Sequence, residues 1–534
     1  MSIISIGVSG LTAAQIALST SSSNTTNAYT AGYTLQVANF SEATAGSGVQ
    51  ISSVDRQYNQ FVTSQLNSST SAESALSTYQ TEIDQIDSLL ADGDASLDTL
   101  MQSFFSSIQT LTSDASDTAA REEVIGAAQT LTSQFTQLGS YLDDMADDVN
   151  SQIDDQVSQV NDLSEQIADL NKKISLSDAL GSTANSLLDQ RDLLVSQLSE
   201  LVDVDVTTQT NGSYTVSLSN GLALVSGNDS FELQTAVSAS DPTQTVVTYV
   251  DAAGHTTTLD DSTFEGGSLG GLMDFRDNSL SDAQNQLGIL AVSLTQAFNT
   301  LQAAGVDLNG DTGSALFSVA DPSVYGNTQN SGDAVLSATF TDDVSALSAT
   351  DYTVKYSDTD GYTVTRNDTG ASVDATYDSD TLTFAGMSVT ISGTAENGDS
   401  FLVLPTRNAA SSFTTLTSDG SLIAAGTSTG ASDNSNALLM LNLQTDSIVG
   451  GSKTLAQTYS ALVSDVGSTA SKVAGQLETQ TSLTEQLTAL QQSESGVNLD
   501  EEAANLIVYQ QYYQACAKVV EVGTSLLDTI LDIN

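Results

Sequence analysis

The chain has very few of the residues on which disulfide, histidine and nucleic-acid chemistry depend. Of its 534 residues one is cysteine, Cys516, and one is histidine, His255. A single cysteine excludes an internal disulfide and a zinc site built from several cysteines, and a single histidine removes most routes to histidine-dependent catalysis. Twelve Lys and Arg residues stand against 66 Asp and Glu, which leaves a formal net charge of −54. Because such a surface repels phosphate backbones and anionic lipids, we expect no binding to nucleic acid or to membranes.

Long apolar runs and a cleavable leader are also not apparent in the sequence. No uninterrupted apolar run approaches the ~18 residues that a membrane-spanning helix needs, so we expect a soluble protein. A secretory signal begins with a basic region, whereas the first basic residue here is Arg56. If the chain leaves the cell, we therefore expect export without a cleaved signal peptide.

Proline is limited to Pro242, Pro322 and Pro405, all in the middle of the chain. Neither end therefore contains the residue that most strongly breaks helices. Over 124–174, apolar residues recur in alternating steps of four and three with one stutter, which is the pattern of a coiled-coil face. At 1.5 Å per residue this helix would extend roughly 75 Å. Shorter seams over 76–90 and 187–201 would supply antiparallel partners in a rod.

The central part of the chain changes to the two-residue period of strands. Alternation begins after Val202, and Asn211-Gly212 and Asn220-Gly221 are typical of hairpin turns, because both residue types tolerate positive φ. A second strand-rich block covers about 334–406, and helical spacing returns between the two blocks.

We therefore predict an α+β multidomain chain, with long coiled-coil-like terminal helices forming a rod and β-rich domains inserted in the middle. The predicted segments are an N-terminal assembly segment (1–60), an N-terminal helical rod (61–202), a first β-rich domain (203–265), a helical return (266–310), a second β-rich domain (311–412), a C-terminal rod segment (413–495) and a C-terminal assembly helix (496–534).

Both ends carry apolar seams that we expect to mediate assembly. On the N-terminal seam every second position is a small residue, which would let a partner backbone approach closely. Since helices bury such stripes and chain ends fray unless something holds them, we expect the seams to lack partners within one chain, to be disordered in the monomer and to dock against neighbouring copies. The predicted interface residues are Ile4, Leu11, Leu18, Leu506, Tyr509, Tyr513, Cys516, Val520, Leu527 and Ile530.

Motifs similar to catalytic and metal-binding motifs occur in the sequence, but each lacks residues that the chemistry requires. Two matches to the serine-nucleophile pattern G-x-S-x-G, at 266–270 and 426–430, both follow the only histidine, whereas the hydrolase order places a histidine after the serine. The run 307–313 is similar to a calcium loop, but glycine stands at its seventh place and Ser318 at its twelfth, so an Asx-Gly turn is favoured. Whether a divalent ion binds near Asp307 and Asp311 stays open. We predict no enzyme activity, no catalytic or metal-binding residues and no cofactor, with His255 in a solvated turn.

Several short motifs resemble those of a known family. They are Ser9-Gly10-Leu11, Asn24, Asn27 and Gly32-Tyr33 near the N-terminus, 188–194 and 267–276 in the interior, and Gly496-Val497-Asn498-Leu499-Asp500-Glu501-Glu502 with Tyr509-Gln510-Gln511-Tyr512-Tyr513 near the C-terminus. The chain is similar in these segments to the flagellar axial proteins, which form the rod, hook and hook-associated family. The interior segments resemble a member of this family at the junction between hook and filament.

The resemblance implies a structural, non-enzymatic subunit of the bacterial flagellum, secreted to the extracellular structure. It implies a ring of copies of this chain between hook and filament, contacts with the hook protein and with the second hook-filament junction protein, and passage through the flagellar type III export apparatus with a cytoplasmic chaperone. The alternatives are another axial subunit, such as a hook protein or flagellin, and an acidic secreted enzyme or adhesin. An adhesin would have no use for two terminal seams.

Overall fold

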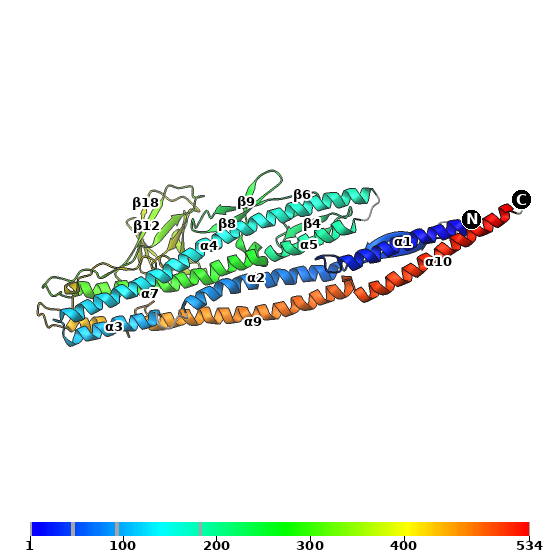
Figure 1. The fold of residues 1–534 in the computed structure, drawn as a ribbon. Helices are drawn as coiled ribbons and strands as arrows, with labels where there is room; N and C mark the ends of the chain where they lie inside the picture. The colour runs from blue at the N-terminus through cyan, green and yellow to red at the C-terminus, as the bar shows by residue number, and fades with distance from the viewer. Residues whose placement is uncertain (1–2, 44–47, 91–95, 181–183, 533–534) are drawn as a thin grey trace.

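The computed structural model describes residues 3–43, 48–90, 96–180 and 184–532, and it shows an elongated molecule (Figure 1). A bundle of long helices forms the rod. The β-rich part lies along one side of the rod, and both chain ends extend together from one end of it. The predicted fold class is confirmed, while the domain boundaries stay predictions. The rod helices are α2 (Gln60–Leu90), α3 (Leu97–Ser113), α4 (Thr118–Ala179), α5 (Asn185–Leu201), α6 (Gly267–Asp274), α7 (Ser281–Ala304), α8 (Ser435–Asn442) and α9 (Leu455–Ser495), with a π-helical segment at Phe275–Leu280 between α6 and α7.

Helix α4 confirms the long helix predicted from the seam over 124–174. It covers 62 residues and begins after Asp117, whose side chain accepts a hydrogen bond from the backbone N–H of Ala119. Such a cap satisfies one of the free N–H groups of the first turn. Most of its seam residues, from Val124 to Ile174, are buried against the neighbouring helices. The rod is therefore held mainly by apolar packing along the full length of α4.

A cluster of aromatic side chains lies between the rod helices and the segments that lead into and out of the second β domain. Phe104, Phe135, Phe298, Phe317 and Phe413 come from α3, α4, α7 and the short strands β10 (Phe317–Ser318) and β20 (Thr414–Thr415) or their edges. Successive ring centroids lie 5.2–5.7 Å apart, mostly edge to face. This geometry is favourable for aromatic pairs, and it anchors the start and end of the β insertion on the rod.

The first β domain consists of two antiparallel sheets. Gly212 and Gly221 have φ of +78° and +85° at the two Asn-Gly turns, so both predicted hairpins are confirmed. The strands are β3 (Val204–Thr208), β4 (Tyr214–Leu218), β5 (Ala223–Ser226) and β6 (Asp229–Ser230) in one sheet, and β7 (Leu233–Val237), β8 (Thr245–Val250) and β9 (Thr256–Thr258) in the other.

The second β domain pairs a five-stranded sheet with a four-stranded one. The two sheets meet through Tyr352 and Phe384, whose rings are 5.5 Å apart. The strand orders are β11 (Ser323–Gly326), β19 (Ser400–Leu404), β13 (Tyr352–Ser357), β14 (Gly361–Arg366) and β15 (Ser372–Val373), and β12 (Val335–Phe340), β18 (Met387–Ser392), β17 (Thr381–Phe384) and β16 (Thr376–Asp378).

The chain ends form a separate unit beyond the rod, made of α1 (Ile3–Asn27), the hairpin β1 (Gln36–Glu42) and β2 (Val49–Arg56), and α10 (Leu499–Asp532). Helices α1 and α10 lie side by side (Figure 1). The expectation that the terminal seams have no partner within one chain is therefore wrong, because each terminal helix covers part of the other's seam.

In the described part of the chain, α1 is long and apolar enough to cross a membrane by length and composition. The expectation from the sequence considered only uninterrupted apolar runs, and for this reason it missed α1. Core helices and signal sequences pass the same test, so one such helix does not by itself indicate a membrane span.

Candidate assembly surface

Helices α1 and α10 run antiparallel and approach each other closely through glycine. A Cβ placed on Gly7 would lie 2.7 Å from Cγ2 of Val520, and one on Gly10 would lie 2.5 Å from Sγ of Cys516. Both distances are shorter than ordinary contacts, so a side chain at either position would require the neighbouring residue of α10 to move. The rest of this face of α1 is also small, with Ala13, Ala14 and Ala17 fully buried. The predicted role of small seam residues in close approach is confirmed, with the partner supplied by the same chain.

Polar contacts fix the end of the α1–α10 pair that lies nearest the rod. The Ser21 hydroxyl donates a hydrogen bond to the buried carboxylate of Glu502. Asn24 donates from Nδ2 to the carbonyl of Gln36 at 2.8 Å, and its Oδ1 accepts from the Tyr33 hydroxyl at 2.8 Å and from the Gln36 N–H at 3.1 Å. One asparagine therefore sets the turn between α1 and the β1–β2 hairpin.

The β1–β2 hairpin lies against the same helix pair. The backbone N–H of Val49 donates to the Ser9 hydroxyl at 3.3 Å, and the Phe40 ring packs against Tyr509 and Tyr512 of α10 with centroid distances of 6.1 and 6.2 Å. Phe40 remains 41% exposed. The terminal unit is thus a three-part assembly of two helices and a hairpin.

A second apolar seam of α10 faces solvent. We call it the outer seam, and its members recur in steps of seven, four, three and four: Val508, Ala515, Val519, Val522 and Leu526. The four larger side chains are 40–58% exposed. The only charged residues between 503 and 531 are Lys518, Glu521 and Asp528. Glu521 and Asp528 lie on a different face of the helix from the outer seam, whereas Lys518 borders it beside Ala515 and Val522. On α1, the side chains of Ile3, Ile6, Val8 and Ile16 are exposed as well. A monomer rarely leaves so many neighbouring apolar side chains in water, so this surface is a candidate interface.

The ten residues predicted from the sequence occupy three different environments. Ile4, Cys516 and Val520 face the contact between α1 and α10. Leu11, Leu18, Leu506 and Tyr509 are partly buried, whereas Tyr513, Leu527 and Ile530 are exposed. Since Ile4 lies opposite Gly523, the last residues of α10 extend beyond the described part of α1. We call the face of α10 that contacts α1 the inner seam, and its members are Leu506, Tyr509, Tyr513, Cys516, Val520, Gly523, Leu527 and Ile530. Leu527 and Ile530 therefore continue the inner seam into solvent.

Three family models match the chain. They describe the helical domain of the flagellar hook-associated protein FlgK over residues 83–317, a D2-like domain of flagellar hook-associated protein 1 over 325–405, and the C-terminal region of the flagellar basal body rod proteins FlgE, FlgF and FlgG over 491–533. The flagellar hook-associated protein 1 of Salmonella typhimurium is 40% identical over 551 aligned positions, covering all of both chains. The chain belongs to the flagellar hook-associated protein 1 family.

More distant relatives and a solved structure agree with this family. The Escherichia coli K12 protein is 39% identical over the full length of both chains, and the Bacillus subtilis protein is 27% identical over 98% of this chain and 96% of its own. The solved structure of the flagellar hook junction protein FlgK from Burkholderia pseudomallei superposes with a TM-score of 0.74 at 32% identity, covering 80% of this chain and all of that one.

Within this family fold, the motif over 188–194 ties the terminal unit to the rod. Arg56 of β2 pairs with Asp189 at 3.1 Å and with Asp192 at 2.5 Å, both on α5. Burial disfavours the charge of Arg56, but the interactions with Asp192, Tyr214 and Asp189 together outweigh this, so the pKa of Arg56 is raised. The Tyr214 hydroxyl donates to Asp192 at 2.8 Å, and burial together with that carboxylate raises the Tyr214 pKa. The sequence motif alone gave these residues no role, because their partner Arg56 lies more than 130 positions away.

The described residues offer no clear alternative site. They contain no group of three or more His, Cys, Asp and Glu that could hold a metal ion. His255 is 78% exposed and lies 3.1 Å from Asp251 in a turn, as predicted. The carboxylate of Asp307 accepts bonds from the backbone N–H groups of Asn309 and Asp311, which confirms the Asx-Gly turn.

Proposed function

We propose that this protein is a structural, non-enzymatic subunit at the junction between the flagellar hook and filament, and that it assembles through α1 and α10. The observation that supports this most directly is the outer seam, which is apolar, continuous from Ala515 to Leu526 and without a partner among the described residues. The relatives are named as hook-associated and hook junction proteins. The paired terminal helices form one slender unit, and the N- and C-terminal ends of the chain lie near each other at its tip (Figure 1).

The paired helices suit repeated head-to-tail contacts better than a closed dimer. A contact between two different surfaces that does not close on itself generates helical tubes, and a junction between two tubular polymers must share their symmetry. In this arrangement the outer seam of one copy would bury against a neighbouring copy, while the β domains would project away from the terminal unit. The inner seam would hold α1 and α10 together inside each copy.

The wider partners follow from the family resemblance. We propose that the ring contacts the hook protein on one side and the second hook-filament junction protein on the other. We also propose that the chain reaches this extracellular position through the flagellar type III export apparatus, with a cytoplasmic chaperone and without a cleaved signal peptide. The match over 325–405 to a hook-associated protein 1 domain favours this role over that of a hook protein or flagellin.

The test is complementation of a strain that lacks this gene. The wild-type gene should restore filaments, which are counted by electron microscopy. Val522→Asp places a charge in the outer seam at a side chain that is 48% exposed in the single chain. Its folding should therefore change little, whereas assembly would have to bury an unpaired carboxylate at a cost of several kcal/mol. We expect hooks without filaments.

Ser525→Asp is the matched control, since it adds the same charge to an exposed position three residues away on the polar face of α10. This variant should complement nearly as well as wild type. Normal filaments with Val522→Asp would reject the outer seam as the interface. If the deletion strain itself grew normal filaments, the junction role would be rejected.

A further inference from the structure

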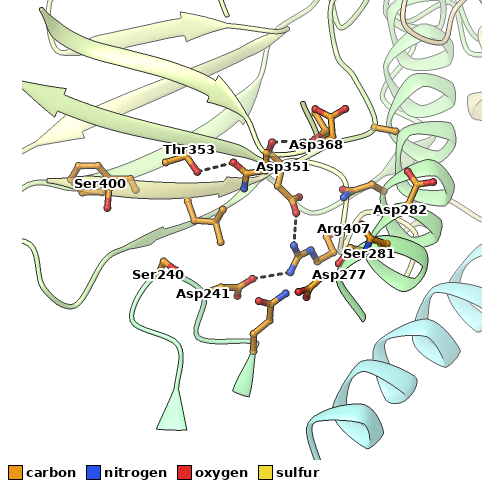
Figure 2. A pocket seen from close by; sticks show the side chains of 18 of the residues that line it. Ser240, Asp241, Asp277, Ser281, Asp282, Asp351, Thr353, Asp368, Ser400 and Arg407 are labelled. Atoms are coloured by element: carbon orange, nitrogen blue, oxygen red, sulfur yellow. Dashed lines mark hydrogen bonds and ion pairs between the residues drawn. The ribbon is translucent and has the colours of Figure 1, made fainter. Parts of the chain in front are cut away.

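The two β domains meet across a polar cavity rather than through a packed core. None of the described strands β3–β9 pairs with any of β11–β19. A cavity of about 540 Å³ lies between the loop over 240–244 of the first domain, the segments 349–353 and 400–402 of the second domain, and the start of α7 (Figure 2). Small polar interfaces of this kind leave relative domain motion as the default.

Arg407 spans this cavity (Figure 2). Its Nη1 lies 2.9 Å from Oδ2 of Asp241, in the loop between β7 and β8, and its Nη2 pairs with Oδ2 of Asp351, directly before β13. The side chains are only 11%, 7% and 7% exposed for Arg407, Asp241 and Asp351. The planar guanidinium thus bonds one carboxylate of each β domain at the same time.

The base of Arg407 is fixed on the rod. The preceding residue, Thr406, is fully buried and donates from Oγ1 to Oδ1 of Asn285 in α7 at 2.6 Å. A Cβ placed on Gly288 of the same helix would lie 1.7 Å from the Thr406 carbonyl oxygen, so the backbone at Thr406 rests directly on α7. Arg407 therefore extends from a fixed point toward both β domains.

Arg407 provides the positive charge that balances the buried carboxylates of Asp241 and Asp351. Asp241 also accepts bonds from the N–H and hydroxyl of Thr243, whereas the ion pair of Asp351 is with Arg407. Burial raises the Asp351 pKa, and the Arg407 charge opposes that shift. Removing one partner of a buried ion pair leaves an uncompensated charge. Here it would leave two buried carboxylates on opposite sides of the cavity.

We propose that Arg407 is a latch that sets the angle between the two β domains by holding Asp241 of the first and Asp351 of the second against α7. One further direct contact between the domains is the backbone bond from the N–H of Thr328 to the carbonyl of Ala239 at 2.9 Å. Without the latch, the carboxylates repel and the second domain pivots about its attachment to the rod. The latch does not involve the terminal helices, so its test is independent of the test of the assembly proposal.

The test measures the distance between two spin labels in the full chain, with Cys516→Ala as background. Labels at Thr257→Cys in β9 and Ala375→Cys beside β16 occupy exposed positions of the two domains. With Arg407→Met we expect the distance distribution to become about twofold broader, as for domains without a fixed interface. Asp241→Asn removes only the first-domain carboxylate and leaves the Arg407–Asp351 pair intact, so it should broaden the distribution while the second domain stays folded.

Arg366→Met is the matched control, since Arg366 pairs with Asp368 at 2.6 Å inside the second β domain. It should leave the distribution unchanged. Unchanged distributions with Arg407→Met would overturn the latch. A broad distribution with Arg407→Met but not with Asp241→Asn would also overturn it, because the effect would then come from damage within the second domain.

Discussion

At the scale of single residues, the contact between Gly10 and Cys516 limits how the terminal helices can pair. The missing side chain of Gly10 makes room for the sulfur, and Gly7 does the same for Val520. Cys516 is partly buried as a reduced thiol, and a buried thiol behaves as a small apolar side chain. We therefore expect its size to matter more than its chemistry.

Gly10→Ala should separate α1 from α10, because the added methyl group would lie 2.5 Å from the Cys516 sulfur. Overpacking of this kind typically costs about 1–3 kcal/mol, so amides in both helices should exchange faster with solvent. Cys516→Ala alone should leave filament growth intact, and the double variant should regain slow exchange because the sulfur is gone. Gly475→Ala is the control, since nothing lies within 4 Å of its added Cβ. Equally fast exchange in the single and double Gly10 variants would contradict the contact.

The inner seam shows how far single residues can be placed from sequence. The three-four spacing placed Cys516 and Val520 correctly on one apolar face of a helix. The spacing could not say that α1 covers this face, because a seam defines a surface and not its partner. The outer seam was missed although its signal is present, since Val519 and Val522 stand next to inner-seam positions and are just as apolar.

At the scale of elements, α10 has two apolar faces, one that packs against α1 and one that is exposed. Its inner face joins α1 up to Gly523, and its last residues reach past the described part of that helix. Leu527 is 45% exposed and Ile530 64% exposed on this extension. Its exposed apolar side chains lie past the described part of α1, so we expect a neighbouring copy to complete their packing.

Leu527→Asp tests this extension. In the single chain the aspartate would be solvated, so the rod and β domains should fold and export should continue. In the assembled ring the charge would be desolvated at a cost of several kcal/mol. We expect cells with complete hooks, no filaments, and both this protein and flagellin in the medium. Leu527→Met is the control and should swim normally, since it keeps an apolar side chain. A ring that persists with Leu527→Asp would show that the extension is not part of the interface.

The sequence predicted the elements better than their contacts. Most of the length of α4 followed from its apolar seam, which has one stutter, and the two hairpins followed from Asn-Gly pairs whose glycines take positive φ. The Arg407 contacts could not be predicted, because its two partners lie 56 and 166 positions away along the chain and carry no local pattern. Periodicity reports which residues face inward, whereas such long-range polar contacts depend on how the domains are placed.

At the scale of the whole molecule, the charge is almost entirely of one sign. Twelve cationic residues face 66 acidic ones, and several of the arginines are already used in buried pairs, such as Arg56, Arg276 and Arg407. The remaining surface is left with closely spaced carboxylates that repel one another. Such self-repulsion lowers the stability of the folded state while it keeps the protein soluble.

Salt should therefore stabilise the folded chain. Between about 0.01 M and 0.15 M salt the Debye length falls from about 30 Å to about 8 Å, so repulsion between separated carboxylates is largely screened. We expect the thermal unfolding midpoint in NaCl near pH 7 to rise by several degrees over this range. The control is the same series near the pI of about 4.1, where the net charge is small and the gain should mostly disappear. A saline habitat would account for the acidity under this hypothesis. If stability near pH 7 did not increase between low and high salt, charge repulsion would not limit the fold, and this explanation of the composition would be discarded.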